Sequence, residues 1–299
     1  MVFAMQPNYP DPPITMAVRL EAMENKRIAI IGAGSMGQAI LGGLINSGFD
    51  PAMVCASTST AKNSKALSEK FSVTSLAIED NSDANSRACL DAEIILLAVK
   101  PAKILETLSD IKDSIQQGSL VVSVAAGITT NAIEEIIDDK AAVIRAMPNT
   151  PSIVGHGLTG LAKGATASDA DLALAKSLFE TVGQVLVVDE EMINALSTIS
   201  GSGPAYVFYF AEKLTKAAID LGFSEQEADL MVRSTFLGSS MLLATSEKSP
   251  EELRAQVTSP NGTTMQATNT FDEHKIEETI SLATKAALAR AIELGKVKS

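Results

Sequence analysis

Basic side chains are in short supply in this sequence. Its 299 residues include 24 Lys and Arg against 36 Asp and Glu, which leaves a formal net charge of −12. Nucleic acids and anionic membrane surfaces are bound through basic faces. The charge balance therefore argues against both as partners, and we interpret the surplus of acid as ordinary solubilising charge.

Cysteine and histidine are also scarce. Cys55 and Cys89 are the two cysteines, too few for a disulfide framework, so we interpret them as reduced, buried thiols of a cytoplasmic protein. The two histidines, His156 and His274, have no H-E-x-x-H spacing, and no C-x-x-C occurs. Without a metal-ligand spacing we expect surface histidines and no metal site.

Long apolar runs are absent, and none approaches the ~18 residues of a membrane span. The first 25 residues contain four prolines but neither the basic start nor the apolar centre of a secretory signal. We expect residues 1–25 to form a loose arm, with Met16 or Met23 as an alternative start.

What the sequence does contain, from Lys26 onward, is a regular alternation of short apolar runs with helix-like stretches. Such near-continuous apolar strands, separated by helices, are typical of a parallel sheet covered on both faces. The predicted strands are 27–31, 53–57, 93–99, 120–126 and 142–147, with weaker ones at 157–162 and 184–189.

The strand signal stops after Asp189, and the rest of the sequence predicts helices. We therefore expect an α/β protein: an N-terminal Rossmann-like doubly wound sheet followed by an all-α C-terminal domain. The apolar runs AYVFYFAEKL and MVRSTFLGSSMLLA exceed what one small helical domain buries, which favours an intertwined dimer. The predicted organisation is an arm at 1–25, a dinucleotide-binding domain at 26–188, and a dimerisation and substrate domain at 189–299. Its helices are predicted at 190–199, from Gly203, at 225–246, at 249–257 and from about Thr264.

A glycine-rich loop lies between the first predicted strand and the following helix. It reads Ile31-Gly32-Ala33-Gly34-Ser35-Met36-Gly37, a G-x-G-x-x-G in the context where that motif binds a dinucleotide. Gly32 would permit the tight turn, Gly34 the approach of a pyrophosphate, and Gly37 close packing of helix on strand. The helix N-terminus would offer N–H groups to the anion. The alternative is a purely structural turn.

The end of the second strand indicates which dinucleotide binds. NAD-preferring sites place an acid there for the ribose 2′-OH, whereas this sequence reads Ala56-Ser57-Thr58-Ser59-Thr60-Ala61-Lys62. Hydroxyls and a lysine can donate to a 2′-phosphate that a carboxylate would repel. We therefore predict NADP, with NADPH preferred over NADH. The alternative is a polar loop with no ligand.

Two more strand ends, Ala98-Val99-Lys100-Pro101 and Ala125-Ala126-Gly127, are predicted at the same crevice, because ligands of doubly wound sheets bind at carboxyl ends of strands. Lys100 has a second interpretation as a solvated charge. After the next strand, Met147-Pro148-Asn149-Thr150-Pro151 has two prolines that stiffen the loop, as suits a cofactor wall.

A polar interruption in the helical half, VTSPNGTTMQA at 257–267, is the candidate substrate loop. A helix restarting at Thr263 presents unpaired N–H groups. Gly262 permits close approach, Thr264 adds a hydroxyl, and Thr258 and Ser259 can donate or cap. Together they make an anion site for a small carboxylate. The alternative is a capped helix start without a ligand.

These motifs, in order, resemble one known family. GAGSMGQAI, AVKP, MPNTP, SGSGPAY and SPNGTT are similar to those of pyrroline-5-carboxylate reductase, an enzyme of proline biosynthesis, over roughly residues 27–299. The SGSGPAY segment and the loop at 259–264 are specific to that family. Relatives often read SPGGTT, and here Asn261 replaces the first glycine. After glycine, Asn is the residue that best tolerates a left-handed backbone, so the loop geometry can be kept. We interpret SGSGPAY mainly as a structural element.

The resemblance implies roles for individual positions. Thr264 would be the catalytic residue, with its hydroxyl bonded to the ring nitrogen of the substrate. Thr263 and Thr264 together would bind the substrate carboxylate. The wider substrate set would be Ser259, Gly262, Thr263, Thr264 and, from a second subunit, Glu190. The cofactor set would be Ile31, Gly32, Ala33, Gly34, Ser35, Met36, Gly37, Ser57 at the 2′-phosphate, Asn81, Ala98, Val99, Lys100, Pro101, Val124, Ala125, Ala126 and Gln256.

The predicted function is thus NADPH-dependent reduction of the cyclic imino acid Δ1-pyrroline-5-carboxylate to L-proline. The imine carries its own proton, so positioning and charge complementarity can supply most of the rate. The family's homodimers, and larger rings of dimers, are the implied assembly. A hydroxyacid dehydrogenase would need a Lys or His in 190–206, which has neither. A non-catalytic NADPH sensor is the other alternative.

Overall fold

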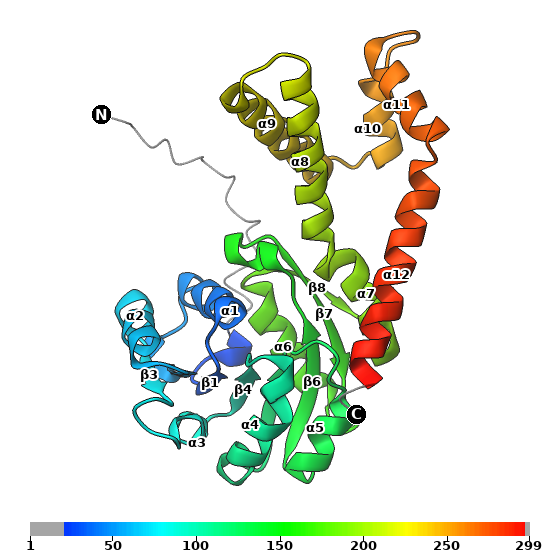
Figure 1. The fold of residues 1–299 in the computed structure, drawn as a ribbon. Helices are drawn as coiled ribbons and strands as arrows, with labels where there is room; N and C mark the ends of the chain where they lie inside the picture. Colours follow the sequence, from blue (N-terminus) through cyan, green and yellow to red (C-terminus); the bar gives the residue numbers. More distant parts are fainter. Residues whose placement is uncertain (1–20, 297–299) are drawn as a thin grey trace, which may run out of the picture. The chain divides into compact units, whose positions relative to one another are not determined.

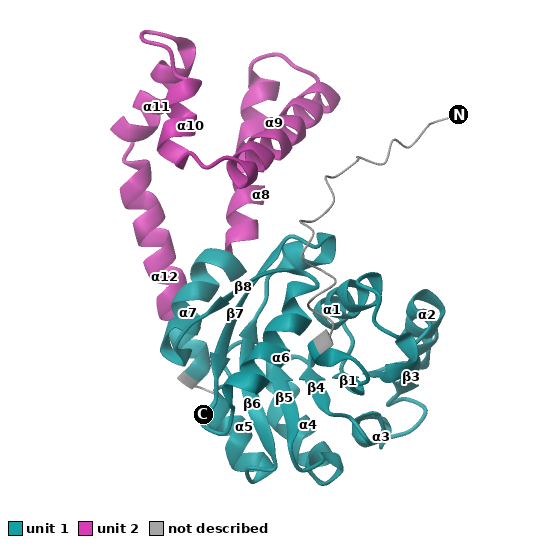
Figure 2. Ribbon diagram, turned by 180° about the vertical axis from the view of Figure 1, so that it is seen from behind, with its two compact units in different colours: residues 1–201, 290–299 teal, residues 202–289 magenta. Residues whose placement is uncertain are grey.

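The computed structural model describes residues 21–296, with the side chains of 22–295. The chain forms two compact units (Figure 2). The first contains the residues up to Gly201 together with the chain end from Arg290, and the second contains Ser202–Ala289.

One eight-stranded sheet organises the first unit (Figure 1). Its strand order is β3-β2-β1-β4-β5-β6-β7-β8, and all neighbours are parallel except β6 and β7. The strands are β1 (Ile28–Ile31), β2 (Val54–Thr58), β3 (Thr74–Ala77), β4 (Ile94–Leu97), β5 (Ser119–Ser123), β6 (Ala141–Met147), β7 (Gly157–Lys163) and β8 (Gly183–Val187). The expected doubly wound sheet is confirmed.

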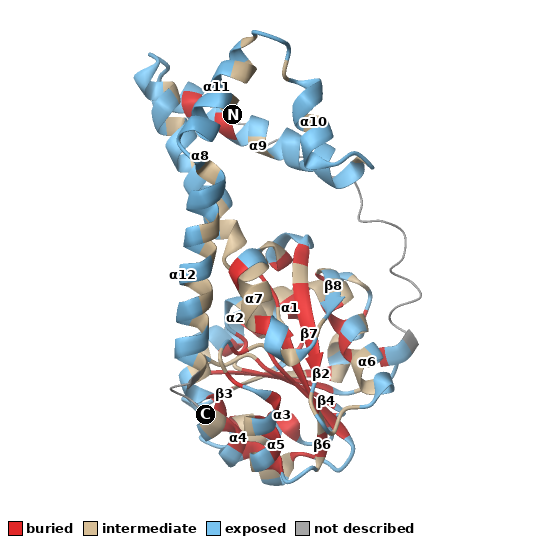
Figure 3. Ribbon diagram, turned by 90° about the vertical axis from the view of Figure 1, so that its right-hand side faces the viewer, coloured by how far each residue is buried: buried red, intermediate tan, exposed pale blue. Residues whose placement is uncertain are grey.

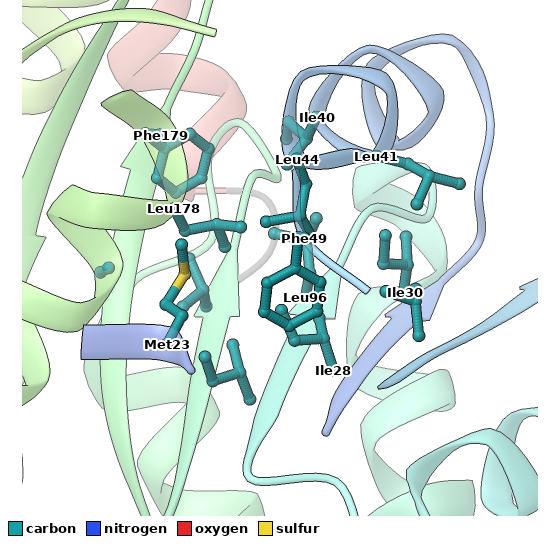
Figure 4. Packing of buried hydrophobic residues seen from close by; sticks show 14 of the residues in the cluster. Met23, Ile28, Ile30, Ile40, Leu41, Leu44, Phe49, Leu96, Leu178 and Phe179 are labelled. Atoms are coloured by element: carbon teal, nitrogen blue, oxygen red, sulfur yellow. The ribbon is translucent and has the colours of Figure 1, made fainter. Parts of the chain in front are cut away.

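Helices cover both faces of this sheet because successive strand residues point to opposite sides. From β1, Ile28 and Ile30 face one core and Ala29 and Ile31 the other. The first core is closed by α1 (Ser35–Asn46), α2 (Ala61–Phe71) and α6 (Asp169–Glu180), and Figure 4 shows its aliphatic and aromatic packing. The second is closed by α3 (Ala84–Cys89), α4 (Ile104–Ile111) and α5 (Thr130–Ile137).

The sequence did not predict β3. Its four residues, Thr74–Ala77, begin with an exposed threonine and contain no apolar run, so neither alternation nor hydrophobicity marks them as a strand. Pairing with β2 makes it one. The structure therefore brings the residues after β3 beside those after β2.

The start of the described chain is anchored in the core. A short turn, η1 (Glu21–Met23), contacts α6, and Met23 is 0% exposed (Figure 4). A loose arm was expected to extend to residue 25, so this end of it is packed. Residues 1–20 of the predicted arm lie outside the described residues.

Several connections in the first unit contain short 3-10 turns. They are η2 (Pro51–Met53), η3 (Pro101–Lys103), η4 (Lys112–Ser114), η5 (Thr150–Val154) and η6 (Glu190–Met192). The helix expected at 190–199 is instead a series: η6, then α7 (Ile193–Leu196), then a π-helical turn, η7 (Ser197–Gly201). Among the described helices, none is both long and apolar enough to cross a bilayer.

The second unit is helical. It contains α8 (Gly203–Asp220), α9 (Glu225–Thr245), α10 (Pro250–Gln256), α11 (Thr263–Glu273) and most of α12 (Ile276–Lys296), whose end belongs to the first unit. Ser224 and Ser249 begin α9 and α10 with reciprocal capping bonds to Glu227 and Glu252. The single helix expected after Thr264 is two helices, because the chain turns at Lys275 with φ +55°.

The second unit has almost no core of its own. Among its described residues only Ala228 and Val232 are buried. Large apolar side chains of α8 and α9 are exposed instead, including Phe208 at 67% and Leu230 at 67%, and these helices are mostly pale blue in Figure 3. An isolated helical unit of this kind leaves unburied the surface that would normally stabilise it.

Candidate cofactor and substrate sites

The glycine turn after β1 has the geometry that its sequence predicts. Gly32 has φ +79°, and a Cβ there would collide with the side chain of Val99. A Cβ on Gly37 would lie 3.3 Å from the Ala98 Cβ and 3.4 Å from the Ile30 Cγ2, so α1 packs closely on the sheet. Around Gly34 the nearest atom to such a Cβ is 3.9 Å away, which leaves the backbone open to a ligand.

The N-terminus of α1 is suited to an anion. Gly34 is its N-cap and provides no side-chain cap, and the first turn contains no acidic residue. Uncapped N–H groups and the positive end of the helix dipole attract a phosphate here. The turn and the helix start therefore fit a pyrophosphate.

Ser57 supports the glycine turn from below. It is 0% exposed, and its Oγ accepts from the Gly32 N–H at 3.2 Å and donates to Asn85 Oδ1 at 2.7 Å. Its carbonyl accepts from the Ala33 N–H at 2.8 Å. The sequence suggested that Ser57 meets a 2′-phosphate, but its hydroxyl is buried and bonded twice. Ser59 and Lys62, after the strand, are the exposed donors.

Asn85 was missed by sequence reasoning. It lies on α3 against Ser57, whereas Asn81, the asparagine of the predicted cofactor set, is exposed ahead of that helix. An asparagine inside a helix gives no sequence signal, because its partner is 28 residues away.

The three predicted cofactor loops lie at adjacent strand ends. Ile31, Leu97 and Ser123 are in register across β1, β4 and β5. Beyond them the ladder continues, with Ala98 N–H bonded to the Ile31 carbonyl at 2.8 Å and Val124 N–H to the Leu97 carbonyl at 3.1 Å. The loops Ala98–Pro101 and Val124–Ala126 thus lie one after the other beside the glycine turn, on its β4 side. Lys100 and Ala126 are exposed, while Ala125 is buried.

Glu190 is engaged within its own unit. Its carboxylate accepts from the Thr130 N–H at 2.9 Å and the Thr130 Oγ1 at 2.7 Å, at the start of α5. It also pairs with Arg145 Nη1 at 3.2 Å, and the side chains of Arg145 and Glu190 are 5% and 24% exposed. Arg145 Nη2 donates to Asn194 Oδ1 at 3.3 Å. This network joins β6, η6 and α7 to the helix that follows the Val124–Ala126 loop.

Two sequence motifs meet at Asn149. Its Nδ2 donates to the Ser200 carbonyl at 3.0 Å, and its Oδ1 accepts from the Leu158 N–H at 2.9 Å. The MPNTP loop and the first part of SGSGPAY are therefore held together. Ser200 lies in the π-helical turn, an element often found at functional sites.

The candidate substrate loop lies in the second unit. Asn261 has φ +57°, whereas Gly262 has φ −80° and is the N-cap of α11 without a side-chain cap. The left-handed position thus falls on Asn261. A Cβ at 262 would displace the Ser259 hydroxyl and lie 3.1 Å from the Ser259 carbonyl oxygen, so glycine gives this loop room. The Gly262 N–H bonds to the Ser259 carbonyl at 3.0 Å. Gln256, at the end of α10, is exposed.

Neither cysteine has the properties of a nucleophile. Burial raises the pKa of Cys55 and raises the pKa of Cys89 to about 12. A thiol with so high a pKa stays protonated and unreactive near neutrality. Among the described residues there is also no group of three or more His, Cys, Asp or Glu side chains placed to hold a metal.

A glycine turn on a doubly wound sheet, followed by a helical unit, defines the class: a dinucleotide-dependent oxidoreductase of two units. Two family models match it. "NADP oxidoreductase coenzyme F420-dependent" matches residues 27–127, and "pyrroline-5-carboxylate reductase dimerisation" matches residues 190–294.

Whole-chain similarity identifies the family. The pyrroline-5-carboxylate reductase of Vibrio alginolyticus is 36% identical over 92% of this chain and 100% of its own, and that of Pseudomonas aeruginosa is 35% identical over 92% and 98%. The structure of the Coxiella burnetii enzyme matches with a TM-score of 0.84 at 36% identity, covering 90% of this chain and 98% of that one. The chain belongs to the pyrroline-5-carboxylate reductase family.

Proposed function

We propose that this protein reduces Δ1-pyrroline-5-carboxylate to L-proline, with NADPH as the preferred reductant. The observation that carries the proposal is the 36% identity with a pyrroline-5-carboxylate reductase over 92% of the chain. The structure supports it with a glycine turn suited to a dinucleotide and a helix start suited to a small carboxylate. When bound, NADPH would supply a hydride to C5 of the imine, whose nitrogen carries the proton, so NADP⁺ and the secondary amine would result.

The first unit would hold the cofactor. The turn at Gly32–Gly37 and the start of α1 would bind the pyrophosphate, because this backbone is open at Gly34. Ser59 and Lys62 would meet the 2′-phosphate, and Ala98–Pro101 and Val124–Ala126 would border the nicotinamide. Asn81 and Gln256 remain candidates for further cofactor contacts.

The loop at Ser259–Thr264 would hold the substrate. N–H groups of Thr263 and Thr264, at the uncapped start of α11, would bind the carboxylate, and the Thr264 hydroxyl would bond the ring nitrogen. We assign Glu190 a different role from the predicted substrate contact, because Thr130 and Arg145 already occupy its carboxylate. It would position the start of α5.

We also propose a homodimer formed through the second unit, with a ring of dimers as a further assembly. The support is the missing core: exposed side chains of α8 and α9 need a partner surface. Sedimentation at micromolar protein should show a species larger than the 31.3 kDa chain. A monomer alone would contradict the proposal. A cytoplasmic location is proposed from the two free thiols.

One assay tests the activity. NADPH oxidation is followed with Δ1-pyrroline-5-carboxylate, then with an open-chain keto acid, and both are repeated with NADH. We expect turnover with the imine and more with NADPH. Turnover of the keto acid alone would indicate a hydroxyacid dehydrogenase, and NADPH binding without any turnover would indicate a sensor.

A further inference from the structure

An acidic side chain from the turn that follows β3 reaches the start of α2, shortly after β2. Glu79 Oε2 accepts from the Ala61 N–H at 2.8 Å. The backbones also run together here: the Glu79 N–H bonds to the Ser59 carbonyl at 3.2 Å, and the Ile78 N–H to the Thr58 carbonyl at 2.9 Å. The end of β2, which contains no acid in the sequence, therefore acquires one that lies 18 residues beyond Ala61 in the chain.

Glu79 lies where an anion is favourable. Ala61 is the first residue of α2, after the N-cap Thr60, and this helix has no acidic residue in its own first turn. A carboxylate on a first-turn N–H satisfies an otherwise unpaired donor and complements the helix dipole. The carboxylate of Glu79 thus occupies the place that a phosphate oxygen would take on this helix.

This place borders the ribose side of the proposed cofactor site. In doubly wound dinucleotide-binding units, the group at the end of the second strand senses the ribose 2′ position. The end of β2 contacts the glycine turn directly, through Ser57 and Gly32. A 2′-phosphate beside Ser59 and Lys62 would therefore meet Glu79.

We propose that Glu79 sets the preference between NADPH and NADH. Its carboxylate accepts from the N–H at the start of α2. The 2′-phosphate of NADPH must therefore displace this carboxylate or lie beside its like charge. The 2′-hydroxyl of NADH need do neither. The donors Ser59 and Lys62 favour NADPH and Glu79 opposes them, which makes the preference smaller than the loop sequence suggests. This inference rests on the proposed dinucleotide site.

The test compares Glu79→Gln with Asp80→Asn. Gln keeps an acceptor for the Ala61 N–H and removes only the charge. Asp80 is also exposed and is the adjacent acid, so its substitution changes net charge equally without touching α2. Binding of 2′,5′-ADP and of ADP is measured by calorimetry for both variants and the wild type, at low and high salt, beside kcat/KM for NADPH and NADH.

We expect Glu79→Gln to tighten 2′,5′-ADP on the order of tenfold at low salt, with less gain at high salt, since exposed charges are screened. The affinity of Glu79→Gln for ADP should change little, and Asp80→Asn should change the affinity for 2′,5′-ADP much less. Equal shifts in the two variants, or an unchanged ratio of 2′,5′-ADP to ADP in Glu79→Gln, would overturn the proposal. If the imine is not reduced but the nucleotide ratio still shifts, the proposed reaction fails and the role of Glu79 stands.

Discussion

Replacing Glu190 by alanine separates two roles that the sequence and the structure give this residue. As a substrate contact, its loss would raise KM for the imine and leave the fold intact. As the partner of Arg145 and Thr130, its loss would leave a guanidinium that is 5% exposed without its carboxylate. Removing one member of a buried pair costs about 3–5 kcal/mol of folding free energy.

The structure places the expected cost at the lower end of that range. Glu190 is 24% exposed and the N–O distance to Arg145 is 3.2 Å, so water already screens the pair in part. The bonds to Thr130 are shorter, at 2.9 and 2.7 Å, and hydrogen bonds to a charged group contribute about 1.5–3 kcal/mol. We expect Glu190→Ala to lower the free energy of unfolding by about 3 kcal/mol.

Urea unfolding at one fixed protein concentration measures this change, because the stability of an oligomer depends on concentration. Glu191→Ala is the matched control, since Glu191 is the exposed neighbour and should change stability by less than about 0.5 kcal/mol. Thr130→Val, which removes the hydroxyl bonded to Glu190, should lower the free energy of unfolding by part of that amount. Thr130→Ser, which keeps the hydroxyl, should lower it little. A Glu190→Ala protein as stable as the control, with KM for the imine raised and kcat retained, would refute the positioning role and restore the substrate contact.

Three further predictions concern the loop and the thiols. Thr264→Ala should lower kcat/KM by about 10- to 100-fold, the value of one hydrogen bond to a charged group, with NADPH titrations unchanged. Thr263→Ala, which keeps its backbone N–H, should be mild; equal losses would contradict the assignment. Gly262→Val should lower kcat/KM more than either threonine variant, because a Cβ there meets Ser259. Steady-state kinetics measures this loss, and wild-type activity would be inconsistent with this packing. Burial raises the pKa of Cys89 to about 12 from 9.0, so the unfolded thiol loses its proton first and unfolding free energy should fall with pH between those values. Cys89→Ala should lessen that fall in urea titrations, and an identical pH profile would show that the thiol is not held protonated.

Local patterns predicted most of the sheet and the glycine turn. β1 and β4 are continuous apolar runs buried on both faces, and the spacing of Gly32, Gly34 and Gly37 specifies a turn by itself. Such features depend on neighbours in the sequence, which is why they can be read from it.

Contacts between distant residues could not be predicted. Ser57 lies at the end of a strand as a phosphate-binding serine would, but Asn85, from a helix 28 residues away, accepts from its hydroxyl. Arg145 reads as a charge within a strand, but it is buried and pairs with Glu190, 45 residues later. Glu79 reaches Ala61 because β3 pairs with β2, and β3 itself gave no strand signal.

The return of the chain to the first unit has a consequence for synthesis. Gly127, in the loop after β5, has φ +74° and lies against the end of α12, where a Cβ on it would be 3.5 Å from the Gly295 Cα and the Leu294 carbonyl. A ribosome adding ~5–20 residues per second needs roughly ten to thirty seconds to proceed from one glycine to the other. Throughout that interval the nascent sheet can form while this loop lacks its final neighbour. Completion of the first unit therefore waits until the residues of α12 from Arg290 onward have been synthesised.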